Sequence, residues 1–339
     1  MLALLNIFVD NMIPVLAIAA VGVVLRRRLN VDPAMISRMM FYVFAPALAF
    51  DAVYTSDISG SDFLRVYVGT LALMAAVGAL AFLVLCWLKL AASSRRQISS
   101  REFATTLVAT FVFNGANFGL SIVSFAFGGE GSVDTDPSAL TYAVIIYIAG
   151  STVAWTLGPY VSSRGGSAYA PGGAASTLKS LQGVAASARQ SVLRTPVVYA
   201  LALALALKAA GFSDLPLALS RTSQLLADAS IPLMLVLLGL QLGGFRKPDR
   251  WRLLLSGAAI RLLLAPLVAI VFASLLSLDG AARSAFILQA GMPTAVLTLI
   301  LAYEFDTDRD LALNLIMTTT LLSPISLTVL IYLLQNGIV

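Results

Sequence analysis

Apolar stretches of about 20 residues recur along nearly the whole chain, with short polar connections between them. A stretch of that length forms an α-helix long enough to cross roughly 30 Å of hydrocarbon. The pattern predicts an all-α polytopic membrane protein. Its ten transmembrane helices are expected at residues 6–25, 34–53, 63–88, 103–127, 139–160, 195–211, 216–243, 250–276, 282–303 and 309–335.

Small and polar residues interrupt two of these stretches, the fourth and the ninth, near their middles. The fourth reads Phe-Asn-Gly-Ala-Asn-Phe-Gly over residues 113–119, and the ninth reads Gln-Ala-Gly-Met-Pro-Thr over residues 289–294. Unpaired backbone groups in hydrocarbon cost several kcal/mol each, so irregular chain is tolerated there only inside protein or beside water. Broken helices at corresponding positions of two halves are typical of secondary transporters, and they predict a substrate site at the breaks.

Residues 161–194 form the one long hydrophilic connection and are rich in glycine, serine and alanine. We interpret them as a cytoplasmic linker between a first five-helix repeat, residues 1–160, and a second, residues 195–339. An odd number of helices in each half inserts the second half upside down, which predicts a 5+5 inverted repeat. Pro14 and Pro196, early in the first and sixth spans, are one of several weak correspondences between the halves.

Basic residues are distributed unevenly between the two sides of the predicted bundle. Of the 22 lysines and arginines, 17 fall in or beside odd-numbered loops, four in even-numbered loops, and Arg261 lies inside the eighth span. The positive-inside rule then places the odd-numbered loops in the cytoplasm and both termini outside it. An acidic cluster at residues 304–310 departs from this trend; we interpret it as a solvated connection in which Asp308 caps the last helix.

Composition agrees with a membrane protein and narrows the chemistry. Hydrophobic residues make up 59% of the chain and charged residues 12%, against about 45–50% and about 25% in soluble domains. Histidine is absent and Cys86 is the only cysteine, so histidine-ligated metals, a histidine proton relay and an intramolecular disulfide are excluded. We expect no enzyme activity, no cofactor and no metal. We also expect no nucleic-acid partner, since the basic residues lie in membrane-flanking loops.

The predicted substrate site is built around Asn114 and Asn117, which lie three residues apart and therefore on nearly one face of a helix. Their amide groups donate and accept hydrogen bonds and suit a carboxylate. The alternative is that they bridge neighbouring helices, as polar residues in membranes often do. The remaining candidates come from the two breaks and the last span: Gly119, Ser121, Gln289, Gly291, Pro293, Thr294, Asn314 and Thr318.

Arg261 is the only basic residue well inside a predicted span. A charge at that depth is costly and usually marks function, either attracting an anionic substrate or countering a carboxylate. A long side chain can also reach back to water with its charged end, so both interpretations stay open.

Three segments together carry a resemblance to a known family: Asn-Phe-Gly-Leu at 117–120, the run from Ile231 to Leu242, and Met-Pro at 292–293. In segment order the chain resembles the auxin efflux carriers, within the superfamily that also holds the bile acid sodium symporters. The resemblance implies ten helices as a 5+5 inverted repeat, with helices 4 and 9 broken and crossing near the bilayer centre. Helices 1, 2, 6 and 7 would form a scaffold, and helices 3–5 and 8–10 a moving transport domain.

One residue departs from the family pattern. Members often carry proline two residues after the glycine of the first break, where this chain has Ser121. We expect a milder first break, because Asn114, Gly115 and Gly119 still weaken the helix there.

The function expected from these features is transport of a small organic anion, a carboxylate, across the plasma membrane by alternating access. The lipid bilayer and the anion are the expected partners, together with a homodimer formed through the scaffold helices. Two alternatives remain: a sodium-coupled symporter of the bile acid type, and a channel or sensor with the same fold.

Overall fold

The structure, a computed structural model, describes residues 2–91, 97–127, 138–166, 196–212, 215–242 and 250–339. Every regular element in these ranges is a helix, and none is a strand, which confirms the predicted all-α class. Residues 167–194 of the predicted linker lie outside the described ranges. In chain order the helices are α1 (Leu2–Ile7), η1 (Phe8–Met12), α2 (Ile13–Leu29), α3 (Pro33–Met39), η2 (Met40–Phe44), α4 (Ala45–Tyr54), α5 (Gly60–Ala91), α6 (Ser100–Phe111), η3 (Gly115–Leu120), α7 (Ser121–Phe127), α8 (Ser138–Gly165), α10 (Pro196–Ala209), α11 (Leu217–Leu242), α12 (Trp251–Ala259), η4 (Ile260–Leu264), α13 (Ala265–Leu275), α14 (Gly280–Ala290), α15 (Leu297–Glu304) and α16 (Arg309–Gln335), where η denotes a π-helical segment.

Seven continuous helical stretches of the described chain are long and apolar enough to cross a membrane. They are Ala3–Leu29, Pro33–Tyr54, Gly60–Ala91, Ser138–Gly165, Leu217–Leu242, Trp251–Leu275 and Arg309–Gln335. Each coincides with one predicted span. The other three predicted spans do not reach this length, because α10 has 14 residues and the spans at 103–127 and 282–303 are each divided between shorter helices.

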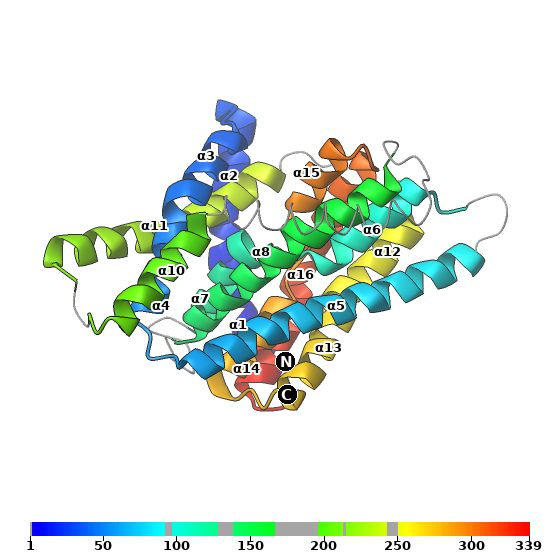
Figure 1. The fold of residues 1–339 in the computed structure, drawn as a ribbon. Coiled ribbons are helices and arrows are strands. Elements are labelled where there is room, and N and C mark those ends of the chain that lie inside the picture. The colour runs from blue at the N-terminus through cyan, green and yellow to red at the C-terminus, as the bar shows by residue number, and fades with distance from the viewer. Residues whose placement is uncertain (1, 92–96, 128–137, 167–195, 213–214, 243–249) are drawn as a thin grey trace, which may run out of the picture.

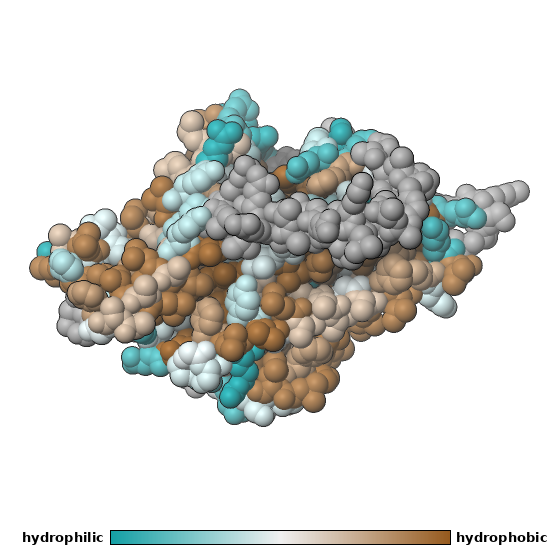
Figure 2. Space-filling view, viewed as in Figure 1, coloured by the Kyte–Doolittle hydropathy of each residue, from teal (hydrophilic) through white to brown (hydrophobic). Residues whose placement is uncertain are grey.

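The surface supports a membrane setting. Hydrophobic residues predominate on the coloured surface to the left of and below the grey atoms in Figure 2, and hydrophilic residues gather mainly at the top and bottom of the view. Large apolar side chains such as Leu83, Trp87 and Leu225 are more than half exposed. Lipid tails would cover such residues without the cost of contact with water.

Proline positions explain three of the four π-helical segments. The segments η1, η2 and η4 each run directly into an α-helix whose second residue is proline, namely Pro14, Pro46 and Pro266. Proline has no N–H, and its ring clashes with the carbonyl group four residues earlier. A π-helical turn contains one extra residue and lets the helix continue past the proline.

Side-chain caps fix two helix starts that border the connecting loops. Ser99 and Glu102 form a capping box at the start of α6. Asp308 accepts a 2.9 Å hydrogen bond from the backbone N–H of Leu311, which confirms Asp308 as the predicted N-cap of α16. These caps satisfy amide groups that helix starts leave unpaired.

The helices pack as two groups, visible on the left and right of Figure 1. In the first, α11 packs along α2 and also contacts α3 and α4, while α10 packs on α4; we name this the α11 group. In the second, α8 packs against α5, α6 and α14, and α12, α13, α15 and α16 complete it; we name this the α8 group. The two groups meet where α4 contacts α8, and η3, which contacts both α11 and α8, also connects them.

Two glycines allow α2 and α11 to approach at backbone distance. A Cβ atom on Gly239 would lie 1.8 Å from the carbonyl oxygen of Ala19, and one on Gly22 would lie 2.1 Å from the carbonyl oxygen of Val236. Small residues are typical of such close helix pairs in membranes, where association depends on packing rather than on exclusion of water.

The close approach predicts that Gly239→Ala separates α2 from α11 and lowers the free energy of unfolding by about 1–3 kcal/mol. The matched control is Gly78→Ala in α5, where the nearest atom to an added Cβ lies 3.8 Å away. Alanine there should be neutral or stabilising, since it favours the helix by about 0.5–1 kcal/mol over glycine. Thermal unfolding of the two purified variants in detergent, followed by size-exclusion chromatography after heating, measures the difference. Equal melting temperatures would contradict the close-packing argument.

Candidate functional site

The chain leaves helical geometry at residues 112–114, after α6, and at residues 291–296, after α14. The two non-helical stretches pair with each other through an antiparallel bridge between Phe113 and Thr294. The N–H of Asn114 donates to the carbonyl of Pro293 at 2.8 Å, and the N–H of Ala295 donates to the carbonyl of Val112 at 3.1 Å. Each stretch therefore satisfies backbone groups of the other, as the apolar surroundings require.

Thr294 fixes this pairing to two neighbouring helices. Its hydroxyl donates to the carbonyl of Ala109 in α6 at 2.8 Å, and its backbone N–H donates to the hydroxyl of Thr319 in α16 at 3.1 Å. Thr294 was a predicted binding residue, and its side chain is here bonded to protein. Thr319 was not among the predicted residues; its one sequence signal is the run of three threonines at 318–320.

Gln289 lies against the glycines of the first interrupted segment. Its Nε2 donates to the carbonyls of Gly115 at 3.3 Å and Ala143 at 3.4 Å. A Cβ on Gly119 would lie only 2.2 Å from its Oε1, so glycine at this position leaves room for the amide. That Oε1 has no hydrogen-bond partner among the described residues.

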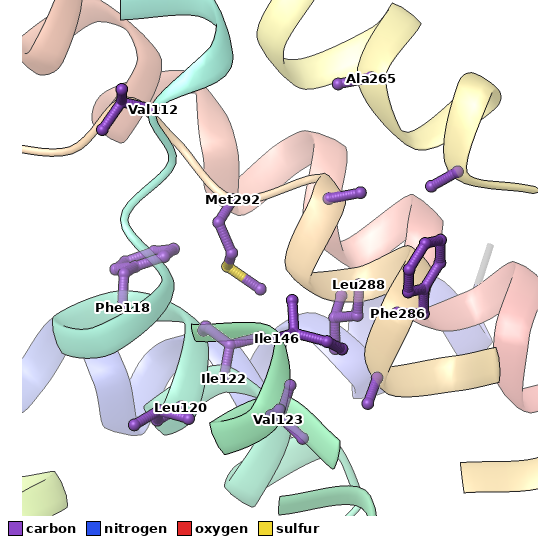
Figure 3. Packing of buried hydrophobic residues seen from close by; sticks show 14 of the residues in the cluster. Val112, Phe118, Leu120, Ile122, Val123, Ile146, Ala265, Phe286, Leu288 and Met292 are labelled. Atoms are coloured by element: carbon purple, nitrogen blue, oxygen red, sulfur yellow. The ribbon is translucent and has the colours of Figure 1, made fainter. Parts of the chain in front are cut away.

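Apolar side chains seal the surroundings of the paired stretches. Figure 3 shows Met292 between the two interrupted segments, with Phe118 and Val112 on one side and Leu288 on the other. Met292 is fully buried, and Phe118 and Val112 are nearly so. The low polarity of this environment strengthens every hydrogen bond made inside it.

The two predicted asparagines have different environments. Asn114 is 5% exposed, and its Nδ2 has no partner among the described residues. Asn117 is partly exposed and lies within η3. The hydroxyl of Ser121 donates to the carbonyl of Asn117 at 3.2 Å, a local bond within the same helix. The side-chain amide of Asn114 is thus a buried hydrogen-bond donor that can still bind an acceptor.

The other predicted residues lie around the second break and along α16. Gly291 is buried, and a Cβ there would lie 2.8 Å from the side chain of Leu330. Pro293 is buried within the pairing. Asn314 is 5% exposed, with an Oδ1 that has no partner in the described chain, whereas Thr318 is partly exposed.

Arg261 comes from η4 and is 2% exposed. Its guanidinium donates to the carbonyl of Thr110 at 2.9 Å and to the carbonyl of Ala290, and lies 5.6 Å from the ring centre of Phe113. Within the described residues it forms no ion pair, so its visible partners are backbone carbonyls rather than a carboxylate. Its side chain does not extend to water.

A cavity of about 270 Å³ lies between the α11 group and the α8 group. Arg26, Ser37 and Gln241 line it from the first group, and Val296 and Thr320 from the second. Gln241 Oε1 and Thr320 Oγ1 are buried without partners among the described residues. Val296 directly precedes α15, so the cavity reaches the second break.

Comparison with known proteins identifies the family of the chain. The family model described as "Membrane transport protein" matches residues 7–331. The chain belongs to this membrane transport protein family. It is also similar to a protein of Methanothermobacter thermautotrophicus described as an uncharacterized transporter, with 29% identity over 301 residues that cover 87% of each chain.

Membership of the membrane transport protein family confirms the resemblance found in the sequence and identifies a multi-pass membrane protein that acts in transport. It indicates a transporter rather than an enzyme. The family match spans both interrupted segments, so the paired backbone is part of the matched region.

The hydroxyl of Thr319 predicts a stability difference between two adjacent threonines of this membrane transport protein. Thr319→Val keeps the shape of the side chain but leaves the buried N–H of Thr294 unpaired, which costs about 1–3 kcal/mol. Thr318→Val, one residue away and partly exposed, is the matched control and should change little. Thermal unfolding in detergent compares the two variants. A Thr319→Val protein as stable as the control would show that the bond is dispensable.

Proposed function

We propose that this chain is a secondary transporter that carries a small organic anion, a carboxylate, across the plasma membrane by alternating access. The observation that carries the proposal is the meeting of four helix ends at the paired non-helical stretches. The C-terminal ends of α6 and α14 and the N-terminal ends of the Gly115–Phe127 helix and of α15 converge there. Helix ends facing one another inside an apolar bundle are typical of transporter binding sites.

An anion fits the N-terminal ends better than a cation does. Helix N-termini carry partial positive charge and unpaired N–H groups, which favour carboxylates. The buried Nδ2 of Asn114 adds an unpartnered donor beside the start of η3. A carboxylate supplies acceptors only and therefore complements donors of this kind.

The cavity between the two helix groups supplies a route to this site. Arg26 lines it, and no carboxylate does among the described residues, so its charge favours an anionic solute. The unpartnered oxygens of Gln241 and Thr320 would accept hydrogen bonds from water or from hydroxyls of the solute.

The two packing groups support a moving-domain mechanism. The α11 group corresponds to the expected scaffold helices 1, 2, 6 and 7, and the α8 group to the expected transport helices 3–5 and 8–10. We propose that the α8 group shifts against the α11 group, so that the site faces one side of the membrane and then the other. The finer architecture, ten helices as a 5+5 inverted repeat with crossing helices 4 and 9, is part of this proposal.

Orientation and assembly complete the proposal. The charge bias places both termini outside the cytoplasm. The N and C labels lie near each other in Figure 1, and an even number of crossings would account for this. We also propose that a homodimer forms through the scaffold helices of the α11 group.

The proposal predicts that Asn114→Ala and Asn117→Ala each weaken anion binding by about 10- to 100-fold, the cost of one hydrogen bond to a charged group. The matched control is Asn336→Ala, an exposed asparagine after α16. Thermal shifts measured with a panel of dicarboxylates and aromatic monocarboxylates first identify a bound anion.

Counterflow of the identified anion in proteoliposomes then tests the variants. Saturable, exchange-stimulated flux is expected for the transporter, whereas a channel would give flux without exchange stimulation. Dependence on a sodium gradient would favour the symporter alternative. Unchanged transport in both asparagine variants would remove these residues from the site, and no flux for any anion would remove the proposed function.

A further inference from the structure

We propose that Arg261 is a positioning residue whose guanidinium holds the C-terminal ends of α6 and α14 together. Its fixed positive charge removes the need for a dissolved cation between these two helix ends. The inference goes beyond the proposed function, because it concerns how the paired backbone is held whether or not an anion is carried. Its consequence for coupling, set out below, rests on the proposed function.

The two carbonyls that Arg261 contacts belong to different helices. Thr110 is the penultimate residue of α6, and Ala290 is the last residue of α14. Ala290 directly precedes the stretch at 291–296, and only Phe111 separates Thr110 from the stretch at 112–114. One guanidinium thus joins the ends of two segments that are about 180 residues apart in the chain.

The need for a cation follows from the helix ends. The last carbonyls of a helix have no partner within it and carry partial negative charge, so two C-terminal ends that meet in an apolar interior repel one another. A guanidinium is planar, permanently charged and rich in donors, which lets it bridge two carbonyls at once. The ring of Phe113, 5.6 Å away, adds a further favourable contact for the cation.

Local geometry fixes the guanidinium in place. Arg261 lies in the π-helical segment η4, which ends just before Pro266 in α13. The backbone position is therefore set by a constrained turn rather than by a mobile loop. Arg261 is 2% exposed, so it does not exchange its partners for water in this conformation.

A dissolved ion has little room beside Arg261. The adjoining cavity, bordered by Thr70, Phe113 and Ala290 among others, has a volume of about 10 Å³, close to the minimum for one water molecule. Its described lining contains no carboxylate. Since the charge is already supplied, we infer that assembly of the paired backbone, and with it transport of the anion, is independent of sodium.

The test measures hydrogen exchange of the backbone amides of Asn114 and Ala295, whose hydrogen bonds form the pairing. Arg261→Ala is purified in guanidinium at about 10 mM, which is far below the molar range that unfolds proteins. Exchange of both amides is expected to match wild type to within a few-fold. After exchange into N-methylglucamine of equal ionic strength, it should accelerate about tenfold or more, since bonds to a charged group are lost.

Two controls separate a positioning role from general loss of stability. Arg283→Ala removes a partly exposed arginine of α14 that donates to the hydroxyl of Ser274 in α13, and guanidinium should leave the exchange of this variant unchanged. Arg261→Lys keeps the charge without the fork of donors and should be intermediate. In wild type, replacing sodium by potassium or by N-methylglucamine should leave both amides unaffected.

Three results would overturn the inference. The first is that guanidinium fails to restore protection of the two amides in Arg261→Ala, or that this variant remains unfolded with guanidinium present. The second is unchanged protection in that variant without guanidinium. The third is a sodium requirement for protection in wild type. None of these readouts depends on transport, so a failed anion assay would count against the proposed function and leave this inference standing.

Discussion

The structure depends on one constraint: backbone N–H and C=O groups surrounded by apolar material must find hydrogen-bond partners. Long helices such as α5 and α16 meet it internally. The segments after α6 and α14 do not, and they meet it by bonding to each other across the bridge between Phe113 and Thr294. Side chains from elsewhere complete the set, since Thr319 accepts from one freed amide and Arg261 donates to two helix-end carbonyls.

The helix ends around the paired stretches differ in their partial charge. The C-terminal ends of α6 and α14 are neutralised by a fixed guanidinium, whereas the N-terminal ends of the two following helices retain their partial positive charge. Under the proposed function, this difference would favour anions at the site, and Arg26 in the lining of the cavity between the two helix groups would add to that preference. Elsewhere the fold favours rigid parts, as in the backbone approach of α2 to α11 at Gly22 and Gly239. The proposed alternating access requires rigid groups of this kind with a cavity between them.

Much of the fold could be predicted from the sequence, because apolar stretch length and the glycine, asparagine and proline positions report directly on helices and on where they weaken. The all-α membrane class is confirmed, and the non-helical residues 112–114 and 291–296 lie within the predicted spans at 103–127 and 282–303. The partners across the bundle could not be predicted. Thr319 is one of three adjacent threonines, and only the rotation of α16 decides which of them meets Thr294. The sequence marks Arg261 as a charge inside a predicted span, but its carbonyl partners lie 29 and 151 residues away, beyond the reach of any local pattern. The predicted linker lies mostly outside the described residues.

Disulfide trapping between positions 113 and 294 tests the central claim most directly, that the two interrupted segments face each other as antiparallel backbone. The bonds on either side of this pair make it a non-hydrogen-bonded pair, in which Cα atoms lie about 4.5 Å apart, within the range a disulfide spans. The double variant Phe113→Cys, Thr294→Cys, in a Cys86→Ser background, should form a disulfide on mild oxidation in membranes. After the chain is cleaved between the two positions, this disulfide should keep the two fragments together. Pairing of position 113 with position 298 serves as the displaced control. Cross-linking confined to 113 and 294 is the predicted result; equal or preferential cross-linking of the displaced pair would contradict the account.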